Sequence, residues 1–394
     1  MSASPASAPA PAPDAPGDWL PGLAQIDLGD TLLVTDGSRP LWRHVALARA
    51  ARSKALILPG RLELRVAPAD HEFATALIAA FAAGEERPAA ADPASRDLLA
   101  LAGRVAAHDV TVLIEGETGT GKEGLARLVH TLSPRRDSPL VAVNCAALPE
   151  TMLEAALFGH ERGAFTGASA PSRGLIRSAD KGSLLLDEVS ELPLVLQAKL
   201  LRTLQEREVL AIGANRAEAV DVRFIACANR DLAGEVAAGR FRADLFYRLA
   251  VFPLRTLPLK ARPDDIAAIA ARWLLRAARG LVPWLTASAL ARLKAHDWPG
   301  NVRELGNVLD RALVLTAGDT IDPEHLVFDR LPVAGLASAA APLTGIVRHH
   351  EDKVIRSVIA ESHSRRAAAE RLGISERTLR YKLAAMRRPS TTVQ

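Results

Sequence analysis

The sequence has few of the features that mark membrane, secreted or disulfide-bonded proteins. No uninterrupted apolar run approaches the roughly 20 residues that cross a bilayer. The first residues lack the basic region and apolar stretch of a secretory signal. The two cysteines, Cys145 and Cys227, lie too far apart in sequence to form a metal-type pair. We therefore expect a cytoplasmic protein with reduced, buried thiols and no membrane partner.

Acidic and basic residues are nearly balanced over most of the chain but not near its end. The 394 residues carry a net charge of +4, with 49% hydrophobic and 24% charged residues, which is ordinary for two or three globular domains. Between residues 348 and 388, however, eleven basic and five acidic residues give a local charge of +6. A basic tail on a nearly neutral body predicts that the tail binds a polyanion.

Composition and hydrophobic periodicity divide the chain into consecutive segments. Near the start we expect a strand over 30–37, a helix over 40–55, strands over 55–60 and 62–68, and a helix over 70–84. From about residue 95 to 330, apolar strands alternate with amphipathic helices, which predicts an α/β fold with a parallel sheet between helices. The expected divisions are a disordered Ala/Pro-rich start (1–17), a small α/β module (18–84), a linker (85–94), an α/β core (95–262), a helical part (263–330), a second linker (331–344) and an all-α end (345–388).

The segment VTVLIEGETGTGKE predicts a phosphate-binding loop, because an apolar strand runs through glycines into a helix. Glycines let successive backbone N–H groups turn toward phosphate oxygens, the helix N-terminus adds its dipole, and Lys122 supplies a positive charge. The alternative is a glycine-rich connector without a ligand, which leaves the strand–loop–helix context unexplained. The expected nucleotide-binding residues are Gly116, Glu117, Thr118, Gly119, Thr120, Gly121, Lys122 and Glu123.

Glu123 departs from the usual motif, which has Ser or Thr at this position to meet magnesium. The metal must then be held mainly by another acid. The segment GSLLLDEVSEL provides one, because an apolar strand ends in Asp187 and Glu188. Ligands of parallel sheets bind at the carboxyl ends of strands. We therefore expect Asp187 to act on Mg²⁺ and Glu188 to polarise the attacking water.

Six motifs then occur in order, and together they resemble one family. The motifs are GETGTGKE, NCAALPE, ERGAFTGA, LLLDEV, FRADLFYRL and WPGNVREL. This part of the chain resembles the AAA+ domain of bacterial enhancer-binding proteins, the activators of sigma-54 RNA polymerase. The resemblance implies an AAA+ P-loop NTPase with an α-helical lid, and ATP and Mg²⁺ as cofactors. It also implies a homo-oligomer, from a dimer to a hexameric ring, that remodels the polymerase holoenzyme from the closed to the open complex.

The hexapeptide GAFTGA is the most specific of these motifs. The resemblance implies that it contacts the sigma factor through Gly163, Ala164, Phe165, Thr166, Gly167 and Ala168. Glycine permits the loop to swing, Phe165 offers an apolar contact and Thr166 a hydrogen bond. An exposed Phe is tolerable if a partner buries it. The alternative is that Phe165 packs into the protein's own core.

The remaining motifs take roles by matched position. Arg242 and Arg248 resemble arginine fingers that reach a neighbouring subunit's γ-phosphate, for which a bidentate guanidinium is suited. Arg303 resembles the sensor arginine of the lid, and Asn144 the residue that couples Glu188 to the GAFTGA loop.

Each of these roles has a structural alternative. A finger arginine can instead pair with Asp244 or another surface acid, Arg303 with Glu304 or Asp310, and Asn144 can satisfy backbone groups at the strand end. At the nucleotide-sensing Asn229 the family usually has a preceding Thr, whereas this chain has Ala228. Nucleotide sensing is therefore expected to differ.

The basic tail contains SRRAAAERLGISERTLRYKL, whose spacing fits a helix-turn-helix with a turn at Gly373 and a cap at Ser375. It resembles a Fis-type DNA-binding domain, which implies dimeric binding to enhancer-like double-stranded DNA. The alternative is a basic helical pair that packs on the ATPase. The residues expected on the DNA-facing side are Arg377, Thr378, Arg380, Tyr381 and Lys382.

The front module is too short for a complete phosphorylatable receiver. Asp36 follows a strand, but a single carboxylate is not an acidic cluster. A degenerate or truncated receiver, or a docking module for a regulatory protein, fits better. For the whole chain, the leading function is a DNA-bound ATPase that remodels sigma-54 polymerase. The alternatives are an AAA+ machine with another protein client and a DNA-binding regulator with a decayed ATPase.

Overall fold

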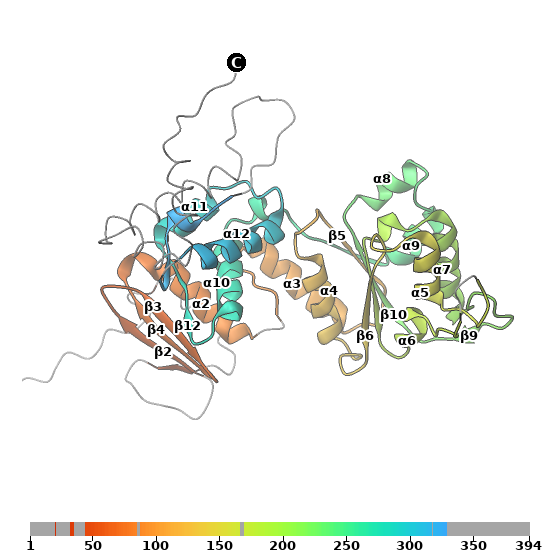
Figure 1. The fold of residues 1–394 in the computed structure, drawn as a ribbon, viewed down its shortest axis with the longest axis horizontal. Coiled ribbons are helices and arrows are strands. Elements are labelled where there is room, and N and C mark those ends of the chain that lie inside the picture. Colours follow the sequence, from red (N-terminus) through yellow and green to blue (C-terminus); the bar gives the residue numbers. More distant parts are fainter. Residues whose placement is uncertain are drawn as a thin grey trace, which may run out of the picture. The chain divides into compact units, whose positions relative to one another are not determined.

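The structure is a computed structural model that describes residues 20, 32–34, 44–84, 87–165, 169–316 and 318–328 (Figure 1). The predictions made for the Ala/Pro-rich start, for Asp36, for residues 166–168 and for the second linker and basic tail lie outside the described residues. None of the described helices combines the length and the hydrophobicity that crossing a membrane requires.

The N-terminal module contains a mixed sheet and one long helix. Its strands are β1 (Leu32–Val34), β2 (His44–Arg49), β3 (Lys54–Leu58) and β4 (Arg61–Val66), and its helix is α2 (His71–Ala83). The pairs β1–β2 and β2–β4 are parallel, whereas β3 and β4 form an antiparallel hairpin. A receiver has a fully parallel sheet, so the described strands of this module do not have the receiver arrangement.

The helix expected over 40–55 is wrong. Residues 44–49 form β2, which pairs along its whole length with β4. The Ala, Leu and Arg residues of this stretch are good helix formers, but Val45 and Leu47 alternate with less buried residues and pack into the core as a strand. Pairing with a distant strand therefore outweighed local propensity.

The second sheet has the order β11-β5-β10-β7-β6, with every neighbouring pair parallel. This confirms the expected α/β fold. The order differs from the sequence order, so the chain crosses over between strands through helices. The strands are β5 (Val112–Glu115), β6 (Leu140–Asn144), β7 (Ser183–Asp187), β10 (Arg223–Ala228) and β11 (Phe252–Arg255).

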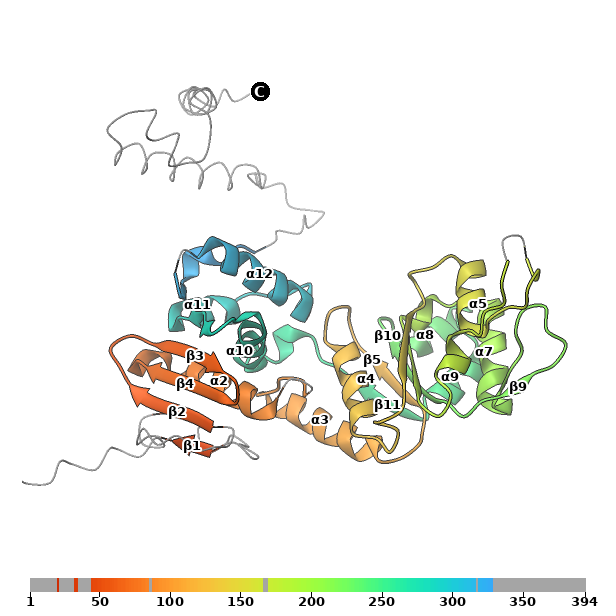
Figure 2. The ribbon, with the colours of Figure 1, turned by 60° about the horizontal axis from the view of Figure 1, so that its bottom comes forward.

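Helices cover both faces of this sheet (Figures 1 and 2). On one face, α3 (Pro93–Ala106) and α4 (Lys122–Thr131) pack against Val112 and Ile114. The residue between these two, Leu113, points to the opposite face, as the period of two in a strand requires. That face carries α5 (Glu150–Phe158), α6 (Leu175–Ser178), α7 (Leu194–Glu206), α8 (Leu232–Ala237) and α9 (Ala243–Leu249), and a two-stranded sheet of β8 (Glu208–Val209) and β9 (Glu218–Ala219) lies nearby in sequence.

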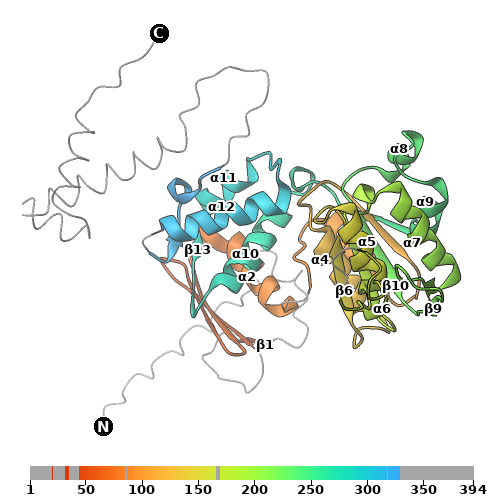
Figure 3. The ribbon, with the colours of Figure 1, turned by 45° about the vertical axis from the view of Figure 1, so that its right-hand side comes forward.

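The helical part after the sheet consists of α10 (Asp265–Ala277), α11 (Ala287–Lys294) and α12 (Asn301–Leu315), which lie next to one another in Figure 3. Two short strands, β12 (Leu281–Val282) and β13 (Trp284–Leu285), lie between α10 and α11, and β14 (Thr320–Ile321) follows α12. One of these, β12, pairs with β3 of the N-terminal module. The module and the helical part therefore share a sheet and, as described below, a hydrophobic core.

Candidate active site

The loop between β5 and α4 has a backbone that requires glycine at two positions. Gly116 and Gly119 have positive φ values of 153° and 79°. A Cβ on Gly116 would lie 2.0 Å from Thr256 Oγ1, and one on Gly119 would lie 2.5 Å from the carbonyl oxygen of Gly300. Larger residues are excluded, so the loop keeps the close backbone approach that a phosphate cradle needs.

Lys122, the first residue of α4, folds back onto this loop. Its Nζ donates hydrogen bonds to the carbonyl oxygens of Gly116 (2.7 Å) and Glu117 (2.9 Å), and only 7% of the residue is exposed. Burial lowers the pKa of the ammonium group, while the nearby Asp187 and Glu188 act in the opposite direction. The predicted lysine and the predicted acid pair are thus brought together around one loop.

Asp187 and Glu188 stand at the end of β7. The Glu188 amide donates to Asp187 Oδ1 over 3.0 Å, and Glu188 itself has a left-handed backbone with φ of 53°. Such a conformation costs a non-glycine residue about 1 kcal/mol or more and is concentrated at functional sites. Burial raises the pKa of Asp187, and the neighbouring charges of Glu188 and Glu123 add to this effect.

Glu123 does not turn into the phosphate loop. Its Oε1 accepts hydrogen bonds from Nε (3.1 Å) and Nη2 (2.7 Å) of Arg127, one helical turn later, and both side chains are more than half exposed. This i,i+4 pair lies on the surface of α4. Asp187 is therefore the better placed of the two carboxylates to act on a phosphate-bound metal.

Two asparagines stand at or directly after the ends of strands that flank β7. Asn144 ends β6 opposite Asp187, and its Oδ1 accepts a hydrogen bond from the Ala146 amide over 2.8 Å, which is the structural alternative considered for it. Asn229 follows β10, and its Oδ1 accepts from Ser190 Oγ over 2.8 Å. Ala228 before it is fully buried in the core of the domain. Roles for these asparagines in catalysis and sensing stay predictions.

The two candidate arginine fingers are exposed at α9. Arg242 forms a bidentate pair with Asp244, with Nε–Oδ1 of 3.0 Å and Nη2–Oδ2 of 2.7 Å, and Asp244 raises the pKa of this guanidinium. Arg248 donates from Nη2 to the Leu204 carbonyl oxygen over 3.3 Å. Arg242 therefore has the ion-pair partner of the structural alternative, and both arginines are exposed.

The helical part closes over the phosphate loop through contacts that the sequence analysis missed. At the start of α12, Asn301 is buried and has a φ of 53°. Its Nδ2 donates to the Thr118 carbonyl oxygen (3.1 Å) and to Glu117 Oε2 (3.2 Å), and the Val302 amide donates to the Gly119 carbonyl oxygen over 2.9 Å. The only signal in the sequence was membership of the WPGNVREL motif.

Arg262 makes a second connection. Its Nη2 donates to the Thr120 carbonyl oxygen over 2.6 Å, and its Nη1 lies 3.3 Å from Oδ2 of the fully buried Asp265. Asp265 Oδ1 in turn accepts from the amides of Ala91 and Asp92, just before α3. No local pattern in KARPDDI pointed to this network.

Arg303, the candidate sensor, lies on the exposed face at the start of α12. Its positive charge is close enough to lower the pKa of Lys122, although burial of the lysine is the larger cause. The two acids offered as alternative partners bond elsewhere: Glu304 accepts from the Gly300 amide (2.8 Å) and Asp310 from Trp273 Nε1 (2.7 Å).

A cleft of about 610 Å³ opens beside the phosphate loop, between α3, α4 and α10. This volume lies within the range of small-molecule sites, roughly 300–1,000 Å³. Its walls combine apolar side chains with arginines. The lining includes Leu98, Leu99, Thr120, Ile269, Trp273 and Arg276.

Two residues that flank the GAFTGA segment bond to each other. The His160 amide donates to the Ser172 carbonyl oxygen over 3.0 Å, and the Ser172 amide donates to the His160 carbonyl oxygen over 2.8 Å. Phe165 is 45% exposed, and its ring meets the edge of the His160 ring at a centroid distance of 4.9 Å. Phe165 is thus not packed into the core, contrary to the alternative considered for it. Gly163 and Ala164 are also described, whereas Thr166, Gly167 and Ala168 are not.

Three family models match consecutive parts of the chain. Residues 89–255 match the sigma-54 interaction domain, residues 260–333 the AAA+ ATPase lid domain, and residues 347–386 the Fis family of bacterial regulatory proteins. The response regulator protein FleR of Pseudomonas aeruginosa is 45% identical over 93% of this chain and 86% of its own length. The chain belongs to the sigma-54-dependent family of transcriptional activators.

Other relatives of this activator support the same family assignment. The transcriptional regulatory protein FlbD of Caulobacter vibrioides is 42% identical over 84% of this chain and 77% of that protein. The crystal structure of NtrX from Brucella abortus in complex with ATP is similar, with a TM-score of 0.57 and 26% identity over 87% of this chain and 82% of that chain. The sigma-54-dependent activator is therefore an AAA+ ATPase with a nucleotide site in its sigma-54 interaction domain and a Fis-type DNA-binding end.

Proposed function

We propose that this activator binds Mg²⁺ and ATP at the phosphate loop, hydrolyses the ATP within a ring of identical subunits, and thereby converts the closed complex of sigma-54 RNA polymerase into the open complex. One observation carries this proposal. The domain that groups Lys122 with Asp187 and Glu188 is the one that displays a half-exposed Phe165 of the GAFTGA segment. A nucleotide-dependent ATPase site and a surface for a protein client thus belong to one folded unit.

The residues present suit magnesium and a triphosphate. The phosphate loop is a cradle in which a Cβ at Gly116 or Gly119 has no space. Carboxylate oxygens are the protein ligands that Mg²⁺ prefers, and Asp187 supplies them while Glu123 is engaged with Arg127. A magnesium ion held there would neutralise charge that develops on the phosphate oxygens. The open cleft beside α3 and α10 is the proposed place of the base and ribose.

In the proposed reaction, Lys122 exchanges its two carbonyl acceptors, Gly116 and Glu117, for phosphate oxygens. Glu188 orients the attacking water and takes its proton as the bond from that oxygen to the γ-phosphorus forms. The bond from the γ-phosphorus to the bridging oxygen breaks, and the electron pair leaves on ADP. The sensor roles of Asn229 and Arg303, and the coupling role of Asn144, belong to the same proposal.

The arginine fingers make the active unit an oligomer. Arg242, directly before α9, and Arg248, within it, are both exposed, so we assign them to the γ-phosphate held by the next subunit in a hexameric ring. Arg242 would leave Asp244 to do so. Dimers bind enhancer-like double-stranded DNA through Arg377, Thr378, Arg380, Tyr381 and Lys382, and a regulatory protein acts on the N-terminal module.

The test is open-complex formation on a supercoiled template with purified activator, sigma-54 holoenzyme and Mg-ATP. Thr166→Ala and Glu188→Gln run in parallel. We expect opening to need ATP and to be lost in both variants, with ATP hydrolysis kept by Thr166→Ala and lost by Glu188→Gln. ATP hydrolysis without opening by the unaltered protein would instead indicate another protein client. Absence of both activities would indicate a regulator with a reduced ATPase.

A further inference from the structure

Residues 44–84, which precede the sigma-54 interaction domain at residues 89–255, pack against the lid. We propose that the N-terminal module (residues 44–84) and the helices α10 to α12 move as one body, and that the module thereby controls how firmly the lid closes over the nucleotide. This proposal deepens the proposed function, because it rests on ATP binding in the cleft beside α10.

The first observation is a strand that the lid contributes to the module's sheet. β12 pairs antiparallel with β3, with Leu281 opposite Leu56 and Val282 opposite Ala55. The Ile57 amide also donates to the Gly280 carbonyl oxygen over 2.7 Å. Without β12, the edge of β3 would present unpaired backbone groups. The lid therefore completes the five-stranded sheet of the module.

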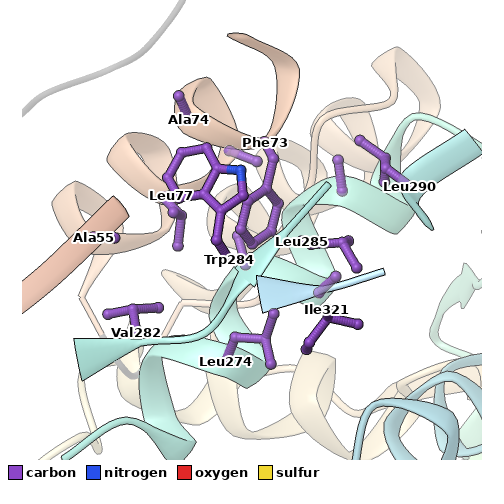
Figure 4. Close-up of a cluster of buried hydrophobic side chains, with 14 of the residues drawn as sticks. Ala55, Phe73, Ala74, Leu77, Leu274, Val282, Trp284, Leu285, Leu290 and Ile321 are labelled. Carbon is purple, nitrogen blue, oxygen red and sulfur yellow. The ribbon is translucent and has the colours of Figure 1, made fainter. Parts of the chain in front are cut away.

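The second observation is a single hydrophobic core. One continuous cluster of buried side chains includes residues of α2 and β3 and residues of α10, α11 and α12. At its centre, the ring of Phe73 meets Trp284 edge to face at 5.3 Å, and both are at most 1% exposed (Figure 4). Close-packed protein interiors have low compressibility and transmit displacements from one element to the next.

Polar contacts also join α2 of the N-terminal module to the lid, at the edges of the shared core. Asp70 Oδ1, at the start of α2, accepts from the Ala287 amide over 3.1 Å. Glu72 pairs with Lys294 over 2.5 Å. At the other end of α2, the Gly84 carbonyl oxygen accepts from Arg272 Nη1 over 2.7 Å. The two parts are thus fixed at both ends of α2.

The third observation is that α10 connects this core with the nucleotide site. Leu274 belongs to the shared core, whereas Trp273 and Arg276 line the cleft. At the first residue of α10, Asp265 holds Arg262, which bonds to Thr120 of the phosphate loop. A shift of α2 that displaces α10 therefore changes the wall of the cleft and the loop together. A partner that binds the module has a physical route to ATP affinity.

The first experiment needs no variant. Hydrogen exchange of the full-length protein is followed by mass spectrometry with and without ADP. We expect peptides from β3 and α2 to exchange at least about threefold more slowly with ADP, in parallel with peptides from 116–122, because local opening of one body is cooperative. Slowing confined to 116–122 and the lid would overturn the proposal. No slowing anywhere would mean that ADP does not bind, which is a failure of the proposed function instead.

The second experiment is a disulfide across β3 and β12, Leu56→Cys with Leu281→Cys. These residues form the pair without mutual backbone hydrogen bonds, where Cα atoms are about 4.5 Å apart, within disulfide range. We expect the bond to form and the oxidised and reduced proteins to have the same kcat and KM for ATP. A bond that does not form, or an oxidised protein with a changed KM, would contradict a single body.

The native cysteines do not interfere with this experiment. Cys145 and Cys227 are at most 2% exposed, and burial raises the pKa of both thiols, that of Cys145 to about 12. Reactive thiolate is therefore scarce at either native position. Each single variant, Leu56→Cys and Leu281→Cys, serves as the control for the substitution itself.

Discussion

Arg262 donates a hydrogen bond from Nη2 to the carbonyl oxygen of Thr120 over 2.6 Å. This contact joins the start of the lid to the phosphate loop, and Arg262 is held from behind by Asp265, which is fully buried. The guanidinium is well suited to this bridge, because it offers several N–H groups in a fixed plane. The loop's position over the nucleotide site therefore depends on a residue outside the loop.

Arg262→Met is expected to weaken ATP binding more than it slows chemistry. Hydrogen bonds to a charged group contribute about 1.5–3 kcal/mol, so KM should rise roughly tenfold or more while kcat changes by less than about threefold. Arg262→Lys keeps the positive charge but lacks the planar set of guanidinium N–H groups, so its KM for ATP should lie between those of the unaltered protein and Arg262→Met. Steady-state ATPase assays measure both constants, and thermal melting controls for folding. An unchanged KM in Arg262→Met would contradict a positioning role for Arg262.

Arg242→Ala and Asp244→Ala are expected to have unequal effects. If Arg242 acts on the next subunit's nucleotide, its removal should lower ATPase activity by about 10³-fold or more, whereas Asp244→Ala only releases the arginine and should keep the rate. Mixing Arg242→Ala subunits with Lys122→Ala subunits should restore part of the activity. Equal, small losses in both single variants would show that the arginine serves only the ion pair seen within one subunit.

His160→Ala is expected to separate ATP hydrolysis from promoter opening. The His160 ring contacts Phe165, and its Nε2 lies 3.1 Å from the Ala170 carbonyl oxygen. Without the ring, Phe165 loses this aromatic contact, so open complexes should fall several-fold while ATPase activity stays. His108→Ala, at an exposed site after α3, is the matched control. Parallel losses of both activities would contradict this separation.

Magnesium-dependent nucleotide binding is expected to weaken as the pH falls. The loss should occur at a higher pH than it would if the pKa of Asp187 were that of an ordinary aspartate. Burial raises the pKa of Asp187 above its usual 3.8, and the metal requires the ionised carboxylate. As the pH falls through this raised pKa, Mg-ADP should lose affinity, whereas ADP in EDTA should not lose it in the same pH window. Calorimetry measures both, with circular dichroism as a check on folding. Identical pH profiles would exclude Asp187 as the metal-linked acid.

The sequence predicted those parts of the site that are local in the chain. The phosphate loop and the strand that ends in Asp187 and Glu188 lie where expected, because a short run of residues determines each of them and the parallel sheet then brings them together. Phe165 was correctly expected at an exposed loop end, because its glycine-rich surroundings provide neither a helix nor a core strand.

The parts that could not be predicted depend on distant partners. β2 has helix-forming residues and becomes a strand because it pairs with β4 on one side and β1 on the other. Asn301 and Arg262 reach the phosphate loop across more than 100 positions of sequence, and nothing near either residue indicates the partner. The pairing of β12 with β3 is a two-residue ladder, too short to leave a periodic pattern in the sequence.

β12 belongs to the lid but completes the sheet of the N-terminal module, and this has a consequence for how such activators diversify. Regulatory domains are commonly exchanged between proteins as self-contained cassettes, cut at an exposed linker. Here a cut near residue 85 would leave Phe73 without Trp284 and one edge of β3 without β12. A chimera that transplants this module onto another activator must carry β12 and the adjoining helices with it. The unit of recombination in this protein is therefore discontinuous in sequence, with the sigma-54 interaction domain inserted between its two halves.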